Sequence, residues 1–477
     1  MIQCGMGASV AIGPKWRRKG TLPSLWRSRF LAYAWDMEQP TKRSMPKPTP
    51  AVSRVLPDGR IVELVFRKEE KRTRFIVGDG NRYEETETLD LPEEGKLVPY
   101  SATNNLIKHE VLLLPDHPEP FGSVPELVSE IEGYLHRYVD LGDSFRTLAA
   151  YYVLLTWVYD AFNELPYLRL RGDYGSGKTR ALFVIGSLCH KAFFASGAST
   201  ISPIFHTLDT FRGTLLFDEA DFRFSDEKAE LVKIFNNGNV RGFPVLRTAV
   251  TQKKEFEPRA FNVFGPKIVA MRRSFEDQAL ESRFFTEEMG NRPLRGDIPI
   301  NLPEKQKEEA LSLRNKLLSY RLFALPKLRI DDSLVDATLS PRLNQILVPL
   351  LSIVGEEELR TPIRMLVQGL DDSLRNARAS SIEGLLVEVL SGLLSTEEGR
   401  LIPVGDVASR LQGMVGVDTG RPLTARYVGY LLRTRLGIET VRRQGVYMVS
   451  DIEPERLETL RARYSLANTN EDINPLY

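Results

Sequence analysis

The segment from Gly172 to Thr179 has the residue types and spacing of a phosphate-binding loop. Glycines let successive backbone N–H groups turn toward phosphate oxygens, and the positive end of the following helix adds to the attraction. We expect Lys178 to reach the β- and γ-phosphates of ATP and Thr179 to bind Mg²⁺. The remaining loop residues would surround the phosphates: Gly172, Asp173, Tyr174, Gly175, Ser176 and Gly177. A chance glycine-rich turn is the alternative.

Two acids at the end of an apolar run would complete this chemistry. The run Gly213-Thr-Leu-Leu-Phe217 leads into Asp218 and Glu219. Such a run is typical of a central parallel strand, and ligands of parallel sheets bind at the carboxyl ends of the strands. Asp218 would hold Mg²⁺, directly or through water, and Glu219 would polarise the attacking water. A simple cap of the strand end is the alternative role for both acids.

The elements that must position these groups alternate between strand-like and helical patterns. Tyr167 to Arg171 is predicted to be a strand and Arg180 to Cys189 a helix, and the alternation continues to about Gly290. This pattern predicts an α/β fold in which helices cover both faces of a parallel sheet.

Together these motifs resemble AAA+ ATPases carried by phages, plasmids and integrated elements. The resemblance covers about residues 123–354 and includes the run from Thr156 to Tyr167, the glycine loop, and Phe217-Asp-Glu-Ala-Asp221. It implies an AAA+ P-loop NTPase core with an α-helical lid, and ATP and Mg²⁺ as cofactors. It also implies a homo-oligomeric ring such as a hexamer.

The same resemblance assigns roles to two arginines. The segment 279–285 is similar to the arginine-finger motif of minichromosome-maintenance helicases, although Phe285 stands where that motif has an acid. Arg283 would reach the γ-phosphate held by a neighbouring subunit and stabilise transition-state charge. A surface salt bridge is the alternative. Ser340-Pro341-Arg342 resembles the start of a sensor-2 helix, so Arg342 would contact the nucleotide, although a proline in the first turn also simply begins a helix.

The strand expected to carry sensor 1 runs from Pro266 to Met271. No Asn or Thr stands at its end, where Arg272 and Arg273 follow instead. Either arginine would contact phosphate or merely neighbour the finger helix, and the sequence leaves both roles open.

A basic segment precedes that strand. Two β-rich runs within residues 245–264 flank a tip with Lys253 and Lys254, which predicts a hairpin. In minichromosome-maintenance and superfamily-3 helicases a hairpin at this place grips DNA in a central pore. The resemblance implies that role for Lys253 and Lys254, with Arg241 and Arg247 nearby, and such phosphate contacts are independent of base sequence. A solvated lysine pair is the alternative.

The C-terminal module has a different pattern. Helical runs over residues 381–394, 404–414 and 423–435 precede a strand pair that turns at Gln444-Gly445, and this order resembles a winged helix. A cationic third helix with a basic wing suits duplex DNA, although winged helices also bind proteins. The candidate DNA contacts are Arg426, Arg433, Arg442 and Arg443.

The domain boundaries follow from these patterns and from composition. We expect a disordered tail over 1–49, a small antiparallel β-rich domain over 50–120, a helical adaptor over 121–165, the ATPase core over 166–300, the lid over 301–370, the winged helix over 378–466 and a flexible tail over 467–477. A polar stretch, 371–380, is expected to separate the lid from the C-terminal module.

The composition limits the class of protein. The 477 residues carry 64 Lys+Arg and 63 Asp+Glu, so any binding of nucleic acid must depend on local basic patches. The 2 cysteines give no disulfide framework. The most apolar stretch, 148–162, is too short to span a bilayer and the N-terminus lacks an apolar signal run, which predicts a cytoplasmic protein.

Three functions are compatible with these features. The first is an AAA+ DNA helicase or translocase that replicates a mobile element. The second is a DNA-binding ATPase that loads or remodels replication proteins without unwinding. The third is a nucleotide-switched regulatory or defence ATPase whose winged helix binds protein.

Overall fold

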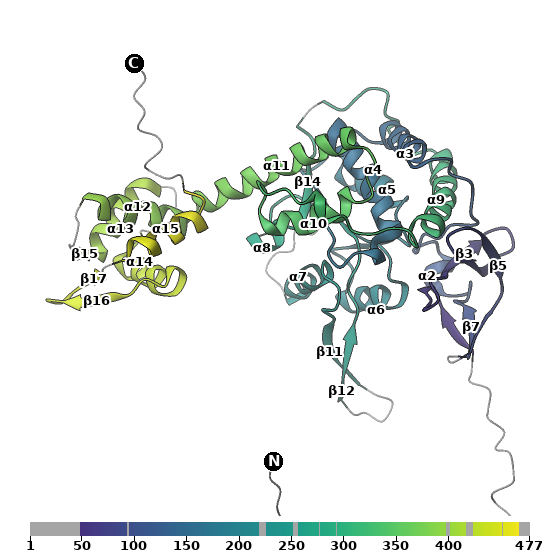
Figure 1. Ribbon diagram of the computed structural model, residues 1–477, viewed down its shortest axis with the longest axis horizontal. Helices are drawn as coiled ribbons and strands as arrows, with labels where there is room; N and C mark the ends of the chain where they lie inside the picture. The colour runs from purple at the N-terminus through teal and green to yellow at the C-terminus, as the bar shows by residue number, and fades with distance from the viewer. Residues whose placement is uncertain are drawn as a thin grey trace, which may run out of the picture. The chain divides into compact units, whose positions relative to one another are not determined.

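The computed structural model describes residues 48–92, 95–218, 226–250, 256–275, 277–291, 293–396, 401–415, 423–450 and 452–466 (Figure 1). Three of the predicted site residues, Glu219, Lys253 and Lys254, lie outside this part of the chain.

The N-terminal β-rich region contains a four-stranded antiparallel sheet. Its strands lie in the order β2 (Ser53–Val55), β3 (Ile61–Arg67), β4 (Arg72–Gly78) and β5 (Tyr83–Thr86). This agrees with the expected antiparallel domain. A second pairing differs, because β1 (Thr49–Ala51) runs parallel to β7 (Gly95–Pro99). Strands this short carry too few residues for a readable alternation of polar and apolar side chains. The short elements β6 (Leu89–Leu91) and α2 (Asn105–Lys108) also belong to this region.

The central sheet has five parallel strands. They lie in the order β14 (Phe284–Glu288), β8 (Tyr167–Arg171), β13 (Lys267–Met271), β10 (Leu215–Asp218) and β9 (Phe193–Ser196). The helices that alternate with these strands are α5 (Lys178–Gly186), α6 (Ile201–Phe211), α7 (Asp226–Gly238) and α8 (Gln278–Glu281). The predicted α/β fold with a parallel sheet is therefore confirmed. Every residue of β13 is buried, because this strand lies between the strand of the glycine loop and the strand of Asp218.

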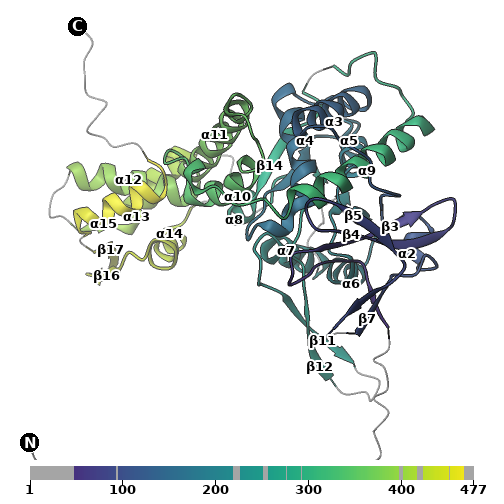
Figure 2. The same cartoon turned by 45° about the vertical axis from the view of Figure 1, so that its right-hand side comes forward.

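Helices α3 (Val124–Tyr138), α4 (Asp143–Val158) and α9 (Glu304–Ala324) lie side by side (Figure 2). A capping box between Ser123 and Glu126 begins α3. Nearly all of α4 is buried, so the most apolar stretch of the sequence forms protein core. Within the described ranges, no helix combines the length and the apolar character needed to cross a membrane.

Two further helices follow, α10 (Pro341–Leu351) and α11 (Glu357–Ala379). The polar stretch 371–380, which we expected to separate the lid from the C-terminal module, is helical rather than a loop, because α11 continues through it to Ala379. Ile363 and Val367 are buried one turn apart, and Asp371 is also buried and forms an ion pair of 2.7 Å with Arg375 one turn further on. These contacts at helical spacing extend the helix through residues whose composition resembles a linker.

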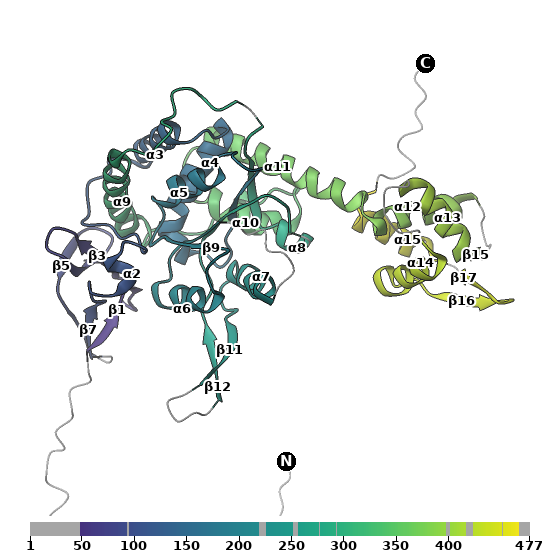
Figure 3. The same ribbon diagram turned by 180° about the vertical axis from the view of Figure 1, so that it is seen from behind.

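The C-terminal module, taken by itself, has the predicted three helices and strand pair (Figure 3). The helices are α12 (Ile382–Thr396), α13 (Val404–Val415) and α14 (Ala425–Leu431), which a π-helical turn continues to Leu436. The strands β15 (Ile402–Pro403), β17 (Val446–Val449) and β16 (Thr440–Arg443) form an antiparallel sheet, and α15 (Pro454–Arg463) follows it. The turn at Gln444 and Gly445 has positive φ at both residues, 48° and 85°, as a tight hairpin turn requires.

Candidate nucleotide site and nucleic-acid interface

The glycine loop connects the carboxyl end of β8 to the start of α5. Gly175 and Gly177 have φ of 73° and 86°, a region of backbone conformation that favours glycine. Gly172 is required for a different reason, since a Cβ there would come 2.4 Å from the carbonyl oxygen of Met289. Lys178 Nζ donates to the carbonyl of Asp173 and, at 3.2 Å, to Ser176 Oγ. The ammonium is therefore held against the loop.

Thr179 and Asp218 meet at the carboxyl edge of the sheet. Thr179 Oγ1 donates a hydrogen bond of 2.8 Å to Asp218 Oδ2, although the two residues come from α5 and β10. A hydroxyl and a carboxylate are oxygen ligands of the kind that Mg²⁺ prefers, especially together with phosphate oxygens. The donor set therefore fits the cation that the sequence predicts.

A cavity of about 1040 Å³ opens beside the loop. Its walls include the loop, the connection between α3 and α4 at Val139 and Asp140, and the segment that follows β14. The guanidinium of Arg272 lies 3.9 Å from the ring centroid of Tyr174 in the loop. Such a cavity is large enough to hold the base and sugar of a nucleotide.

One residue at this cavity, Arg180, was missing from the predicted site, and another, Arg272, was predicted with two roles left open. Arg272 directly follows β13. Its position after the expected sensor strand indicated a phosphate contact, but the sequence did not show whether Arg272 or Arg273 would make it. Arg180 Nη1 donates at 2.6 Å to the carbonyl of Pro299 and so connects α5 to the segment after β14. No sequence pattern indicates this contact, because it joins positions that are more than a hundred residues apart.

Arg283 lies at the edge of the sheet formed by the amino ends of the parallel strands, opposite to the carboxyl ends that carry the glycine loop. It immediately precedes β14, and its carbonyl accepts a hydrogen bond of 2.9 Å from the backbone N–H of Tyr167, the first residue of β8. A parallel strand rises about 3.3 Å per residue, so this edge is about 13 Å from Arg171, where the glycine loop begins. The Arg283 guanidinium donates to the end of α7, at 2.9 Å to the carbonyl and 2.7 Å to the side-chain oxygen of Asn236. Burial lowers the pKa of Arg283.

Arg342 lies beside Arg283. Its Nη1 donates at 3.1 Å to the carbonyl of Ala279, four residues before Arg283. Its charge is close enough to lower the pKa of Arg283, a smaller effect than burial. The structure thus brings the two predicted nucleotide-sensing arginines together, at the edge of the sheet away from the glycine loop.

The predicted hairpin is present as β11 (Val245–Val250) and β12 (Phe256–Phe261), which extend as a two-stranded ribbon (Figure 1). Arg247 on β11 lies 4.6 Å from the ring centroid of Phe205 and 3.7 Å from the carboxylate of Glu230. Arg241 at the base donates to the backbone carbonyl of Asp160 at 2.7 Å. Both arginines therefore have internal contacts at the base of the hairpin, whereas its lysine tip is outside the described residues.

The four predicted contacts of the C-terminal module, Arg426, Arg433, Arg442 and Arg443, are all exposed. Arg433 Nη1 donates at 2.8 Å to Thr440 Oγ1 and so connects the end of the third helix to β16. Tyr427 and Tyr430 are also exposed, with stacked rings 6.5 Å apart. The surface of this module therefore combines cationic and aromatic groups.

No protein-family model and no curated protein matches the chain. Among solved structures, the apo C-terminal region of NrS-1 is 13% identical, with a TM-score of 0.36, over 81% of this chain and 96% of that one. JCV helicase is 14% identical, with a TM-score of 0.23, over 51% and 61%. Drosophila ORC bound to DNA is 11% identical, with a TM-score of 0.19, over 73% and 95%. At this level of similarity, any functional proposal has to rest on the geometry of the site.

Proposed function

We propose that the chain is an AAA+ ATPase that binds Mg²⁺ and ATP at the glycine loop. The observation that supports this most strongly is the 2.8 Å hydrogen bond between Thr179 and Asp218 directly beside the loop. In such a site the bound metal and triphosphate supply the phosphoryl group and neutralise its charge. Lys178 and the loop N–H groups would bind the phosphates, Thr179 and Asp218 would orient the cation, and Glu219 would accept a proton from water.

We further propose that the active form is a homo-oligomeric ring, such as a hexamer, with ATP bound between subunits. Arg283 and Arg342 lie at the edge of the sheet about 13 Å from Arg171, so neither is suited to the loop of its own chain. A subunit that packs this edge against the loop of its neighbour would deliver both cations to one nucleotide. The effect of such a cation is to stabilise transition-state charge.

The proposed substrate is DNA, which the ring would unwind or translocate during replication of a mobile element. The ribbon β11–β12 supports this, since a hairpin with Lys253 and Lys254 at its tip can present cations to a DNA backbone. We propose that the C-terminal module is a winged helix that binds duplex DNA through Arg426, Arg433, Arg442 and Arg443.

The test is ATP hydrolysis and strand separation on a forked duplex, measured with the native chain and with Lys178→Ala. We expect Lys178→Ala to abolish both activities, while Lys233→Ala, an exposed lysine on α7, retains them. Hydrolysis without strand separation by the native chain would favour loading or remodelling instead. Absence of magnesium-dependent ATP binding would contradict the proposal altogether.

A protein partner for the C-terminal module is the second candidate, because its surface exposes apolar groups that DNA does not need. Tyr427, Tyr430 and Tyr447 are 42%, 49% and 53% exposed, and Val446 is 49% exposed. Exposed aromatic groups of this kind are enriched in protein interfaces. Binding of duplex DNA at low salt, lost on changing the four arginines to glutamine, would favour DNA. Unchanged binding in that variant would favour the protein partner.

A further inference from the structure

A second cavity, of about 770 Å³, lies where the N-terminal antiparallel sheet, the core around the five-stranded sheet and the segment after α9 meet. Its walls include residues of β2 and β3, the turn at Tyr159 and Asp160, and the base of the β11–β12 hairpin. It shares no lining residue with the cavity beside the glycine loop. Any ligand bound here would therefore be additional to the nucleotide at the loop.

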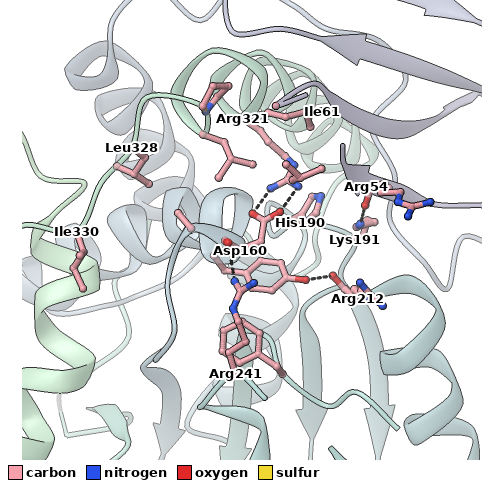
Figure 4. A pocket seen from close by; sticks show the side chains of 18 of the residues that line it. Arg54, Ile61, Asp160, His190, Lys191, Arg212, Arg241, Arg321, Leu328 and Ile330 are labelled. Atoms are coloured by element: carbon pink, nitrogen blue, oxygen red, sulfur yellow. Dashed lines mark hydrogen bonds and ion pairs between the residues drawn. The ribbon is translucent and has the colours of Figure 1, made fainter. Parts of the chain in front are cut away.

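The lining carries an excess of positive charge (Figure 4). One carboxylate, Asp160, lines the cavity, and a second, Glu63, lies behind it. The six cationic residues of the lining are Arg54, Lys191, Arg212, Arg241, Arg321 and Arg329.

Arg321 already engages both carboxylates. Its Nε donates to Glu63 at 2.6 Å and its Nη2 to Asp160 at 2.7 Å. Arg241 and Arg329 donate to backbone carbonyls. Within the described part of the chain, neither of them nor Arg212 has a carboxylate partner. Lys191 also lies 4.0 Å from Glu63. The positive charge of three of the six cations is therefore not compensated by the described acidic groups of the cavity.

The deepest groups are unusually well buried for polar side chains. His190, Lys191 and Arg321 are 1%, 2% and 2% exposed. Burial, and then the charge of Lys191, lower the pKa of His190 to about 4, and burial lowers the pKa of Lys191 to about 8. His190 Nε2 lies 3.2 Å from Glu63, while its Nδ1 is buried with no hydrogen-bond partner among the described residues. A buried polar atom without a partner costs about 1–3 kcal/mol.

We propose that this cavity binds a small, multiply charged phosphate, either an inorganic polyphosphate or the phosphate end of a nucleotide. The ligand would contact Lys191 on the inside and Arg212 and Arg329 toward the rim. Because Nε2 of His190 faces the Glu63 carboxylate, His190 Nδ1 is an acceptor, and a protonated phosphate oxygen would donate to it. A nucleic-acid backbone fits less well, because a polymer that continues past the cavity would reach the rim and not groups that are about 2% exposed. This site goes beyond the proposed ATPase and does not depend on it.

The consequence of such binding follows from the walls of the cavity. Ser53 of the N-terminal sheet, Lys191 of the core and Arg329 after α9 come from three separate parts of the fold. Ser53 Oγ accepts a hydrogen bond from Lys191. A phosphate that contacts Lys191 and Arg329 would therefore stabilise the packing of all three parts, by an amount that grows with its concentration.

The experiment uses the full chain with Lys178→Ala, which removes the main phosphate ligand of the glycine loop. Binding of inorganic pyrophosphate is measured by calorimetry in this background and after adding Arg212→Gln and Arg329→Gln. We expect a saturable site that the two rim substitutions weaken at least about 10-fold, the effect of losing roughly 1.4 kcal/mol of charge-assisted hydrogen bonding. Arg82→Gln, whose side chain is 90% exposed outside the cavity, is the matched control and should leave binding unchanged.

Several outcomes would overturn the proposal. One is no pyrophosphate binding in the Lys178→Ala chain, and another is binding that the rim substitutions do not affect, which would place the anion at the glycine loop. Displacement of pyrophosphate by a single-stranded oligonucleotide whose own binding needs Arg212 and Arg329 would make the occupant DNA.

A parallel titration with ADP separates the two sources of phosphate. Tighter binding of ADP than of pyrophosphate, sensitive to the same substitutions, identifies a nucleotide, and weaker binding identifies an inorganic phosphate.

Discussion

At the scale of single residues, the contact that matters most joins Thr179 to Asp218. A hydroxyl and a carboxylate 2.8 Å apart are already arranged before any cation binds. Their positions are set by two rigid elements, the first turn of α5 and the last residue of β10. Because the ligands need little rearrangement, a bound cation would lose little free energy to ordering of the protein.

The first prediction concerns the charge of this pair. Asp218→Asn keeps an oxygen that can accept the Thr179 hydrogen bond but removes the negative charge that attracts Mg²⁺. We expect ATP binding without magnesium to be nearly unchanged. The factor by which magnesium strengthens ATP binding should fall by more than about 10-fold, the loss typical of a residue that only supports a metal ligand. Fluorescent ATP binding with and without magnesium measures this. Asp58→Asn, whose carboxylate is 52% exposed in the N-terminal sheet region, is the control. Full magnesium dependence in Asp218→Asn would remove Asp218 from the cation site.

The second prediction concerns pH and His190. Its pKa falls to about 4 on folding because of burial and Lys191, whereas an unfolded histidine titrates near 6.5. Between these values the unfolded chain binds more protons, so stability should fall as pH decreases from about 6.5 toward 4. From pH 7 to 5 the loss from this residue is about 2 kcal/mol. Lys191 and then Arg321 lower the pKa of Glu63, and Arg321 lowers the pKa of Asp160, in both cases against the effect of burial, so these two carboxylates add further loss at lower pH.

Urea unfolding at pH 7 and 5, followed by tryptophan fluorescence, tests this expectation. Trp157 is a suitable probe, since its ring lies 4.9 Å from that of His190. His190→Gln can still donate to Glu63 but does not titrate, so it should reduce the difference between the two pH values. The exposed His109→Gln is the control. An equal pH dependence in the native chain and in His190→Gln would show that His190 does not titrate in this way.

At the scale of elements, the hairpin is connected to the rest of the core through α7. Arg247 on β11 pairs with Glu230 on α7 at 3.7 Å, and the far end of α7 accepts hydrogen bonds from Arg283. The first half and the last turn of one helix are therefore each in contact with a proposed functional element. A shift of α7 would move the hairpin together with Arg283. DNA contact at the hairpin would then be coupled to ATP hydrolysis.

The third prediction tests this coupling. Glu230→Gln removes the charge that attracts Arg247 while leaving the glycine loop and the acids of β10 intact. We expect basal ATP hydrolysis to be unchanged and stimulation by single-stranded DNA to fall by about 2- to 30-fold, the range of 0.5–2 kcal/mol typical of coupling residues. Lys233→Gln is the matched control, because Lys233 is the other ionic partner of Glu230. Undiminished stimulation in Glu230→Gln would exclude α7 as the connection.

Much of this element structure was predictable from the sequence, and the exceptions have physical reasons. The glycine loop, the strand before Asp218, the hairpin and the C-terminal helices have local signals in residue type and period. The charged cluster around Glu63 and Arg321 has none, because these partners lie 258 positions apart and each looks like a solvated charge. The insertion of β13 between β8 and β10, and the parallel pairing of β1 with β7, likewise depend on distant contacts that no local period records.

At the scale of the whole molecule, the separation of Arg283 from the glycine loop leads to the fourth prediction. If Arg283 acts on the nucleotide of a neighbouring chain, Arg283→Ala and Glu219→Gln chains are each inactive alone, because each lacks one half of every composite site. In a mixed ring, however, some interfaces combine the intact Arg283 of one chain with the intact loop and Glu219 of the other. Mixing should therefore restore part of the ATPase activity, with a maximum near equal proportions.

The mixing experiment separates this arrangement from a role within one chain. If Arg283 served its own glycine loop, each mutant chain would remain inactive in any mixture. If Arg283 only held α7 through Asn236, Asn236→Ala would reduce activity as much as Arg283→Ala, and mixing would not help. Particle mass with and without ATP and single-stranded DNA provides the control that a ring has formed, since subunits that do not assemble cannot complement. Recovery in mixtures that contain rings would assign the Arg283 edge to the neighbour's nucleotide, and no recovery in such mixtures would contradict the proposed interface.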